Sequence, residues 1–120
     1  VVAAVLGQPE DAAKASAMLR QLSGRVHRVC TAVAVAAIGA SGRIGVRHAL
    51  SVSRVQVAEL SAKDIQQYMA SGEPFGKAGG YAIQGRFAAH VVRIHGSHSG
   101  IMGLPLHETA LLLRQSGVTF

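Results

Sequence analysis

The sequence is poor in residues that mark several common classes of protein. It has no tryptophan, two tyrosines and three phenylalanines, so it offers little on which successive nucleic-acid bases could stack. It has one cysteine, Cys30, which excludes a disulfide within the chain and fits a reducing compartment, so we expect a cytoplasmic protein. Cys30 lies in an apolar run and is expected inside the core. The uncharged residues 29–41 are too few for the ~20 residues that span a bilayer, so no membrane segment is expected.

Acidic residues are also scarce. Twelve Lys and Arg against six Asp and Glu give a net charge of +6 and a pI of about 10.5, which favours an anionic partner. The basic residues are dispersed without a dense run, which argues against nucleic acid as that partner. Hydrophobic residues make up 49% of the 120 residues, so we expect a packed core in a single domain over residues 1–120.

Three segments carry signals of helices, and each is followed by a glycine that marks its end. Ser61 and Asp64 resemble a capping box, and Gly72 marks the end of the segment that they open. The predicted helices cover about residues 10–22, the segment between Ser61 and Gly72, and residues 106–115.

The remaining apolar segments are typical of strands. Residues 26–38 are almost continuously apolar, which favours a central strand covered on both faces. A turn at residues 39–42 leads to a second strand at residues 44–57, so the two form an antiparallel pair. A third strand is expected at residues 87–94, followed by a turn at residues 96–100. The sequence therefore predicts an α/β fold with helices packed on a largely antiparallel or mixed sheet.

Residues 72–85 are the most informative segment, because Lys77 and Gln84 lie there among five glycines. Glycines permit positive φ angles and let a ligand approach the backbone, so the segment is typical of a loop that holds an anion, with phosphate as the first hypothesis. Tyr81 offers a flat ring and Gln84 an amide that donates and accepts, which together suit the edge of a nucleobase. The alternative is a surface loop with a solvated lysine.

Other candidates for chemistry are weaker. His90, His95 and His98 are the tightest group of histidines, but no Cys or carboxylate lies near them in sequence, so we expect surface or half-buried residues and no zinc site. Glu108 is expected to complement the dipole of the last helix from its first turn. Glu73, at the entrance to the glycine loop, has a better claim to contact a metal or a water molecule.

Several motifs in order carry a more specific signal, at residues 5–9, 18–20, 22–24, 27–33, 72–74, 77–85, 103–106 and 108–109. Together they resemble the Maf family of nucleotide pyrophosphatases, also called septum-formation inhibitors, over nearly the whole chain. The resemblance implies an inosine-triphosphatase-like α/β fold with a cleft between two lobes. It also points to dimers, although the sequence leaves the oligomeric state open.

The activity that the resemblance implies is hydrolysis of a nucleoside triphosphate to the monophosphate and pyrophosphate, in a house-cleaning role and with divalent Mg or Mn. Residues 83–85 resemble the branch of the family that acts on dTTP and UTP, together with modified pyrimidine nucleotides. Lys77 then corresponds to the lysine near the phosphates and Gln84 to the residue that selects the base. Tyr81, Gly79 and Gly80 are the further residues expected to bind the substrate.

The sequence also departs from the family pattern. The Ser-x-Ser-Pro-Arg-Arg phosphate motif, the metal-binding glutamate and the Gly-Ala-Asp-Thr aspartate that accepts a proton are not found in this chain. Gln8 stands at the position of the lysine in the family's Leu-Gly-Lys-Pro motif, which removes a charge-assisted contact. We therefore expect an N-terminally truncated Maf-type domain that hydrolyses dTTP slowly by itself. The alternative is an inactive nucleotide-binding or regulatory remnant of the family.

Overall fold

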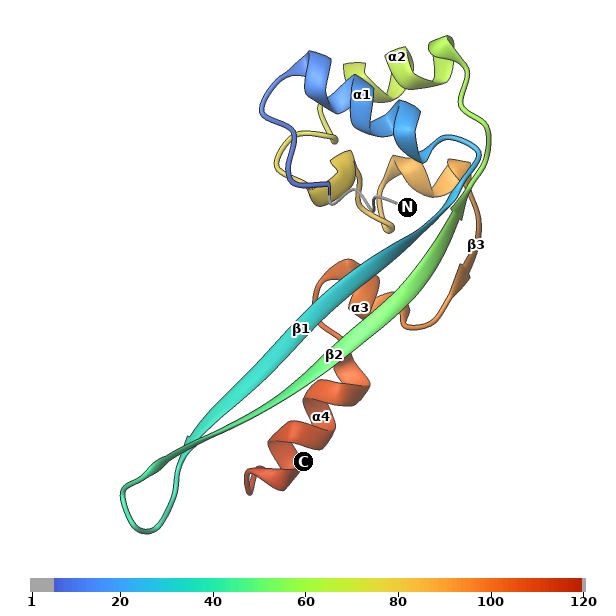
Figure 1. Ribbon diagram of the computed structural model, residues 1–120. Coiled ribbons are helices and arrows are strands. Elements are labelled where there is room, and N and C mark those ends of the chain that lie inside the picture. Colours follow the sequence, from blue (N-terminus) through green and yellow to red (C-terminus); the bar gives the residue numbers. More distant parts are fainter. Residues whose placement is uncertain (1–5, 120) are drawn as a thin grey trace, which may run out of the picture. The chain divides into compact units, whose positions relative to one another are not determined.

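A computed structural model of the protein describes residues 6–119. Strands β1, β2 and β3 form one sheet with β2 between the other two, and helices accompany it, so the predicted α/β class is confirmed (Figure 1). No helix in the described part of the chain is long and apolar enough to cross a membrane. The elements in chain order are α1 (Ala12–Leu22), β1 (Val26–Ile38), β2 (Ile44–Val57), α2 (Ala62–Ala70), η1 (Ala78–Gly80), η2 (Arg86–His90), β3 (Val91–His95), α3 (His98–Met102) and α4 (Leu106–Gln115).

The described residues divide into two compact units. The first unit holds residues 6–27 and 55–94 and includes α1, α2, η1 and η2. The second unit holds residues 28–54 and 95–119 and includes α3 and α4. The long strands β1 and β2 run through both.

Helix α2 begins where the sequence predicts, whereas α1 begins at Ala12 instead of residue 10, and a side chain caps the first turn of each. Asp11 accepts a hydrogen bond from the backbone N–H of Lys14 at 2.8 Å. In α2, Ser61 Oγ accepts from the N–H of Asp64 at 3.0 Å while Asp64 Oδ2 accepts from the N–H of Ser61 at 2.9 Å. The predicted capping box is therefore confirmed, and a cap of this kind stabilises a helix by about 1 kcal/mol.

The β1–β2 hairpin is confirmed, but the expected central position of β1 is wrong. The N–H of Gly39 donates to the carbonyl of Arg43 at 2.9 Å, which closes the turn between the two strands. β2 lies between β1 and β3, so β1 is an edge strand. Exposure alternates along β1, and Cys30 lies on its exposed face instead of in the core. The unbroken apolar run conceals this alternation, because successive strand residues face opposite sides whatever their hydrophobicity.

In the second unit, one face of the hairpin is covered by the C-terminal helices. Thr31 Oγ1 donates to the carbonyl of Gly100 in α3 at 2.7 Å, and Ser53 Oγ accepts from the N–H of Ser97 at 2.9 Å. Ser53 is only 1% exposed. The other face is exposed to solvent within the described residues, and its large hydrophobic side chains are Ile38, Ile44, Val46, Leu50 and Val52.

The segment after the glycine loop differs from the strand expected at residues 87–94. The 3₁₀ helix η2 occupies its first part, and β3 begins only at Val91. Phe87 is 1% exposed, so its apolar side chain enters the core from a helical turn and not from a strand. Helix α3 begins inside the expected turn at residues 96–100 and continues to Met102, and Ser97 Oγ accepts from the N–H of Gly100 at 2.9 Å. Helix α4 has the predicted bounds, with Glu108 in its first turn.

Three aromatic rings form the centre of the first unit. The ring of Phe87 lies 4.6 Å from that of Tyr81 and 5.2 Å from that of Tyr68, measured between centroids. Both tyrosines are buried, and Leu19 of α1 is fully buried in the same unit. Aromatic pairs at these distances add about 0.5–1.5 kcal/mol each to the hydrophobic contribution of their burial. The cluster therefore fixes residues on both sides of Gly85.

His27 extends this cluster with a polar contact. Its Nε2 lies 2.6 Å from the hydroxyl of Tyr81, and the two rings meet edge to face. Burial raises the pKa of Tyr81, so the phenol keeps its proton, while burial lowers the pKa of His27 below 6.5. Nδ1 of His27 is buried without a hydrogen-bond partner among the described residues. A second proton on this ring would therefore place an unpaired charge inside the unit.

We predict that Phe87→Ala lowers the free energy of unfolding by about 3–5 kcal/mol, because it removes a fully buried ring and leaves a cavity. Phe75→Ala is the matched control: Phe75 is 41% exposed, and its loss should cost less than about 1 kcal/mol. Urea denaturation of the three proteins measures both values. Similar losses for the two variants would contradict the central place of Phe87.

We also predict that the protein loses stability below about pH 6.5 through His27. The unfolded chain takes up a proton on this residue at a higher pH than the folded protein does, so the free energy of unfolding falls as the pH falls between the two pKa values. One such group contributes at most about 1.4 kcal/mol per pH unit. Urea denaturation at several pH values should show a weaker pH dependence for His27→Gln and an unchanged one for His107→Gln, which alters an exposed histidine. Equal effects of the two variants would contradict the prediction.

Candidate functional site

The candidate site is the glycine loop of residues 72–85, which follows α2 in the first unit. Gly79 and Gly80 are buried and have consecutive positive φ angles of 70° and 84°. A Cβ atom on Gly80 would lie 3.9 Å from side-chain atoms of Leu19 and Pro74, so the loop packs closely on α1. These two positions need glycine because side chains other than glycine rarely adopt that backbone conformation.

The loop is held against the segment that precedes α1. The N–H of Gly79 donates to the carbonyl of Gly7 at 3.0 Å, which brings Gln8 beside the loop. Pro9 is buried, whereas Gln8 is exposed. The structure therefore brings together two of the sequence motifs that lie far apart in the chain. Residues 1–5, which include the start of the motif at residues 5–9, lie outside the described residues.

Lys77 is the cation of the loop. Its side chain is half-buried, and Nζ donates to the backbone carbonyl of Glu73 at 3.0 Å, so the ammonium group is held near the start of the loop instead of moving freely in solvent. The ammonium has three donors, and this bond uses one. Two donors remain for an anion.

The backbone amides contribute less than a glycine-rich loop suggests. The N–H groups of Gly79, Gly80 and Gly85 donate to the carbonyls of Gly7, Lys77 and Ala82, each at 3.0 Å. An anion cradle needs N–H groups that point at the ligand without another partner. In this loop, the attraction for a phosphate therefore depends on the Lys77 ammonium and not on these amides.

Glu73 is engaged within the protein. Its Oε2 accepts from the N–H of Arg86 at 2.9 Å, and its Oε1 lies 4.0 Å from Nε of the same arginine. A Cβ atom on Gly85 would lie 2.6 Å from Oε2, so glycine is required for this approach. The carboxylate thus caps η2 and holds the end of the loop.

The residues of the site do not fit a bound metal ion. Glu73 is its only acidic side chain, and the contacts with Arg86 occupy it. Among residues 6–119, no three His, Cys, Asp or Glu side chains come together as a metal site. His90, His95 and His98 therefore form no such group in the structure. Mg²⁺ is usually bound through one or two carboxylates together with waters and substrate phosphates, and the loop offers no carboxylate besides the one that Arg86 engages.

Gln84 and Tyr81 occupy different environments. Gln84 is exposed, and no described residue is a hydrogen-bond partner of its side chain, so its amide is free to meet a ligand. Tyr81 is 8% exposed, and its ring packs against Phe87 while its hydroxyl contacts His27. The ring of Tyr81 therefore supports the loop from the core of the first unit.

Two residues of the site are missed by the sequence analysis. His27 opens the motif at residues 27–33 and Arg86 follows the motif at residues 77–85, but neither motif indicates a role for them. Each acts through a contact with a residue distant in the chain, Tyr81 and Glu73 respectively. The motif and the polar position of His27 at the start of an apolar strand are signals in the sequence, but they do not identify Tyr81 as the partner.

Comparison with known proteins agrees with the motif resemblance. The family model described as Maf-like protein matches residues 1–116. A protein of Cupriavidus pinatubonensis named dTTP/UTP pyrophosphatase is 57% identical over 116 residues, which are 97% of this chain and 56% of that relative. Proteins of the same name from Polaromonas sp. and Ralstonia nicotianae are 59% and 61% identical over 114 and 115 residues.

These alignments cover 95% and 96% of this chain but 54% of each of the two latter relatives. The chain therefore spans about half the length of the curated relatives that it matches. Since the family model covers nearly all of the sequence and the relatives align with it at 57–61% identity, the chain belongs to the Maf-like protein family.

Proposed function

We propose that the protein is a nucleoside triphosphate pyrophosphatase that acts on dTTP and UTP. The observation that carries the proposal is the 57–61% identity of nearly the whole chain to relatives named dTTP/UTP pyrophosphatase. The reaction adds one water molecule to a nucleoside triphosphate and releases the monophosphate and pyrophosphate. We propose a house-cleaning role for this reaction, in which it removes pyrimidine nucleoside triphosphates from the nucleotide pool.

Lys77 is the residue that we assign to the phosphates. When the bond between the α and β phosphates breaks, negative charge accumulates on the leaving pyrophosphate. A cation that is already held in place stabilises that charge without reorganising. The hydrogen bond from Nζ to the carbonyl of Glu73 supports this role, because it restricts where the ammonium can lie.

Gln84 is the residue that we assign to the base. A pyrimidine such as uracil or thymine presents carbonyl acceptors and an N–H donor on one edge, and a primary amide complements both kinds of group. The exposure of Gln84 supports the assignment. Gly79 and Gly80 shape the loop between the two residues, Tyr81 supports it, and Gln8 lies at its border.

The divalent metal that the family resemblance implies has no ligand set among residues 6–119. We therefore assign no step of the reaction to it. We place the protein in the cytoplasm as part of the same proposal, which the free cysteine Cys30 supports.

We predict that Lys77→Ala weakens the binding of dTTP at least about tenfold, which corresponds to about 1.4 kcal/mol. Calorimetric titration with dTTP and UTP gives the dissociation constants, and pyrophosphate release with Mg²⁺ or Mn²⁺ in the buffer gives the turnover. Lys63→Ala is the matched control, because it removes an equal charge from an exposed site on α2. Equal affinities of the two variants would refute the role of Lys77, and binding without turnover would favour the inactive remnant.

We predict a different result for Gln84→Glu. The new carboxylate repels the base carbonyls, so dTTP and UTP should bind at least about tenfold more weakly while inorganic triphosphate binds with less than about a threefold change. Gln66→Glu on α2 adds the same charge away from the loop and should leave both affinities unchanged. A parallel loss for dTTP and inorganic triphosphate would show that Gln84 does not read the base.

A further inference from the structure

The excess positive charge of the protein is concentrated in the second unit. Among residues 28–54 and 95–119 there are five arginines and one acidic residue, Glu108. The first unit, by contrast, holds five of the six acidic residues. The even distribution along the sequence therefore conceals a strongly cationic unit. Such a unit attracts anions independently of the glycine loop.

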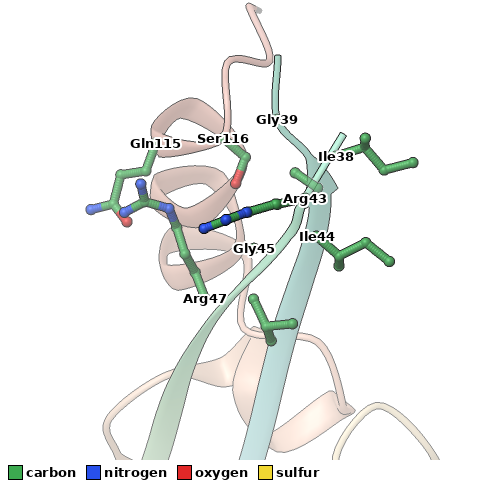
Figure 2. A pocket seen from close by; sticks show the side chains of 10 residues that line it. Ile38, Gly39, Arg43, Ile44, Gly45, Arg47, Gln115 and Ser116 are labelled. Atoms are coloured by element: carbon green, nitrogen blue, oxygen red, sulfur yellow. The ribbon is translucent and has the colours of Figure 1, made fainter. Parts of the chain in front are cut away.

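Two of these arginines line a groove between the tip of the β1–β2 hairpin and the end of α4. The groove has a volume of about 560 Å³, within the range of about 300–1,000 Å³ for small-molecule sites. Figure 2 shows the side chains of Arg43 and Arg47 reaching from the hairpin toward Gln115 and Ser116, whereas Ile44 points to the other side. Both guanidinium groups thus enter the same groove.

Neither guanidinium group has a hydrogen-bond or ion-pair partner within the described part of the chain. The ion pairs there involve other residues, and the one acidic side chain of the second unit lies in the first turn of α4, at the opposite end from the groove. The last carbonyls of α4 do not require the arginines either. The N–H of Ser116 donates to the carbonyls of Leu112 and Leu113, and the N–H of Gly117 donates to that of Arg114. The helix end is therefore capped by its own backbone.

We propose that this groove binds a small anion that carries a phosphate group. Two planar guanidinium groups each present a pair of parallel N–H donors, and a phosphate has enough oxygens to accept from both. A single carboxylate is satisfied by one such group. The amide of Gln115 adds a neutral donor at the rim. The groove consists of residues of the second unit, whereas Lys77 belongs to the first, and the proposal does not depend on the proposed activity.

The arrangement favours a small anion over a nucleic acid strand. Successive strand residues point to opposite faces of the hairpin. Arg28 and Arg54 lie at positions on the exposed face, opposite to the face that carries Arg43 and Arg47. A continuous track of phosphates needs cations along one face. The two arginines of the groove form a compact pair instead.

Titration with inorganic pyrophosphate at low ionic strength tests the proposal, with calorimetry for affinity and NMR of the arginine Nε–H signals for location. We expect the unmodified protein to bind pyrophosphate with changes in the signals of Arg43 and Arg47. The double variant Arg43→Gln/Arg47→Gln should bind at least about tenfold more weakly. The double variant Arg28→Gln/Arg54→Gln removes the same charge from the same unit and should change the affinity less than about threefold. Because all four side chains are exposed, these variants should fold normally.

Equal weakening by the two double variants would overturn the proposal, because it would indicate attraction to the net charge alone. Absence of pyrophosphate binding by the unmodified protein would also overturn it. So would tighter binding of a single-stranded oligonucleotide that both double variants weaken alike. Lys77→Ala should leave the signals of Arg43 and Arg47 responsive to pyrophosphate, so the result is distinguishable from failure of the proposed activity.

Discussion

The packing of Tyr68, Tyr81 and Phe87 is the interaction on which the first unit depends. The chain has only five aromatic residues, and three of them meet in this cluster. Tyr81 and Phe87 lie on either side of Gln84, so burial of their rings fixes the chain at both ends of a short exposed turn. This support suits the base-binding role that we propose for the Gln84 amide, because rigid neighbours limit the entropy lost on binding.

The charged residues differ between the two units in whether protein groups neutralise them. Three of the five acidic residues of the first unit cap helices or hold the loop, namely Asp11, Asp64 and Glu73, so protein groups engage their charges. The second unit has one acidic residue, Glu108, so Arg43 and Arg47 of the groove stay available to solvent and ligands. The same net charge therefore has distinct consequences in the two units, because a charge attracts a ligand only where no protein group neutralises it.

The sequence predicted correctly those features that depend on residues close together in the chain. The capping box of α2, the hairpin turn at residues 39–42 and the bounds of α4 were predictable, because each depends on neighbours in the chain. The edge position of β1 and the exposure of Cys30 were not, because hydrophobicity does not reveal which strand pairs where. The strand expected at Phe87 failed for a similar reason, since burial of its ring is satisfied from a 3₁₀ turn.

For the candidate site, the sequence by itself determined the family and the position of the glycine loop, because motif residues and positive-φ glycines are properties of the chain. Only the tertiary structure decided how that loop works. It engages the backbone amides of Gly79, Gly80 and Gly85 with other carbonyls and binds Glu73 to Arg86. It also joins Tyr81 to His27, from a segment far away in the sequence. These are pairings between distant residues, and a sequence states the groups that can pair without stating which of them meet.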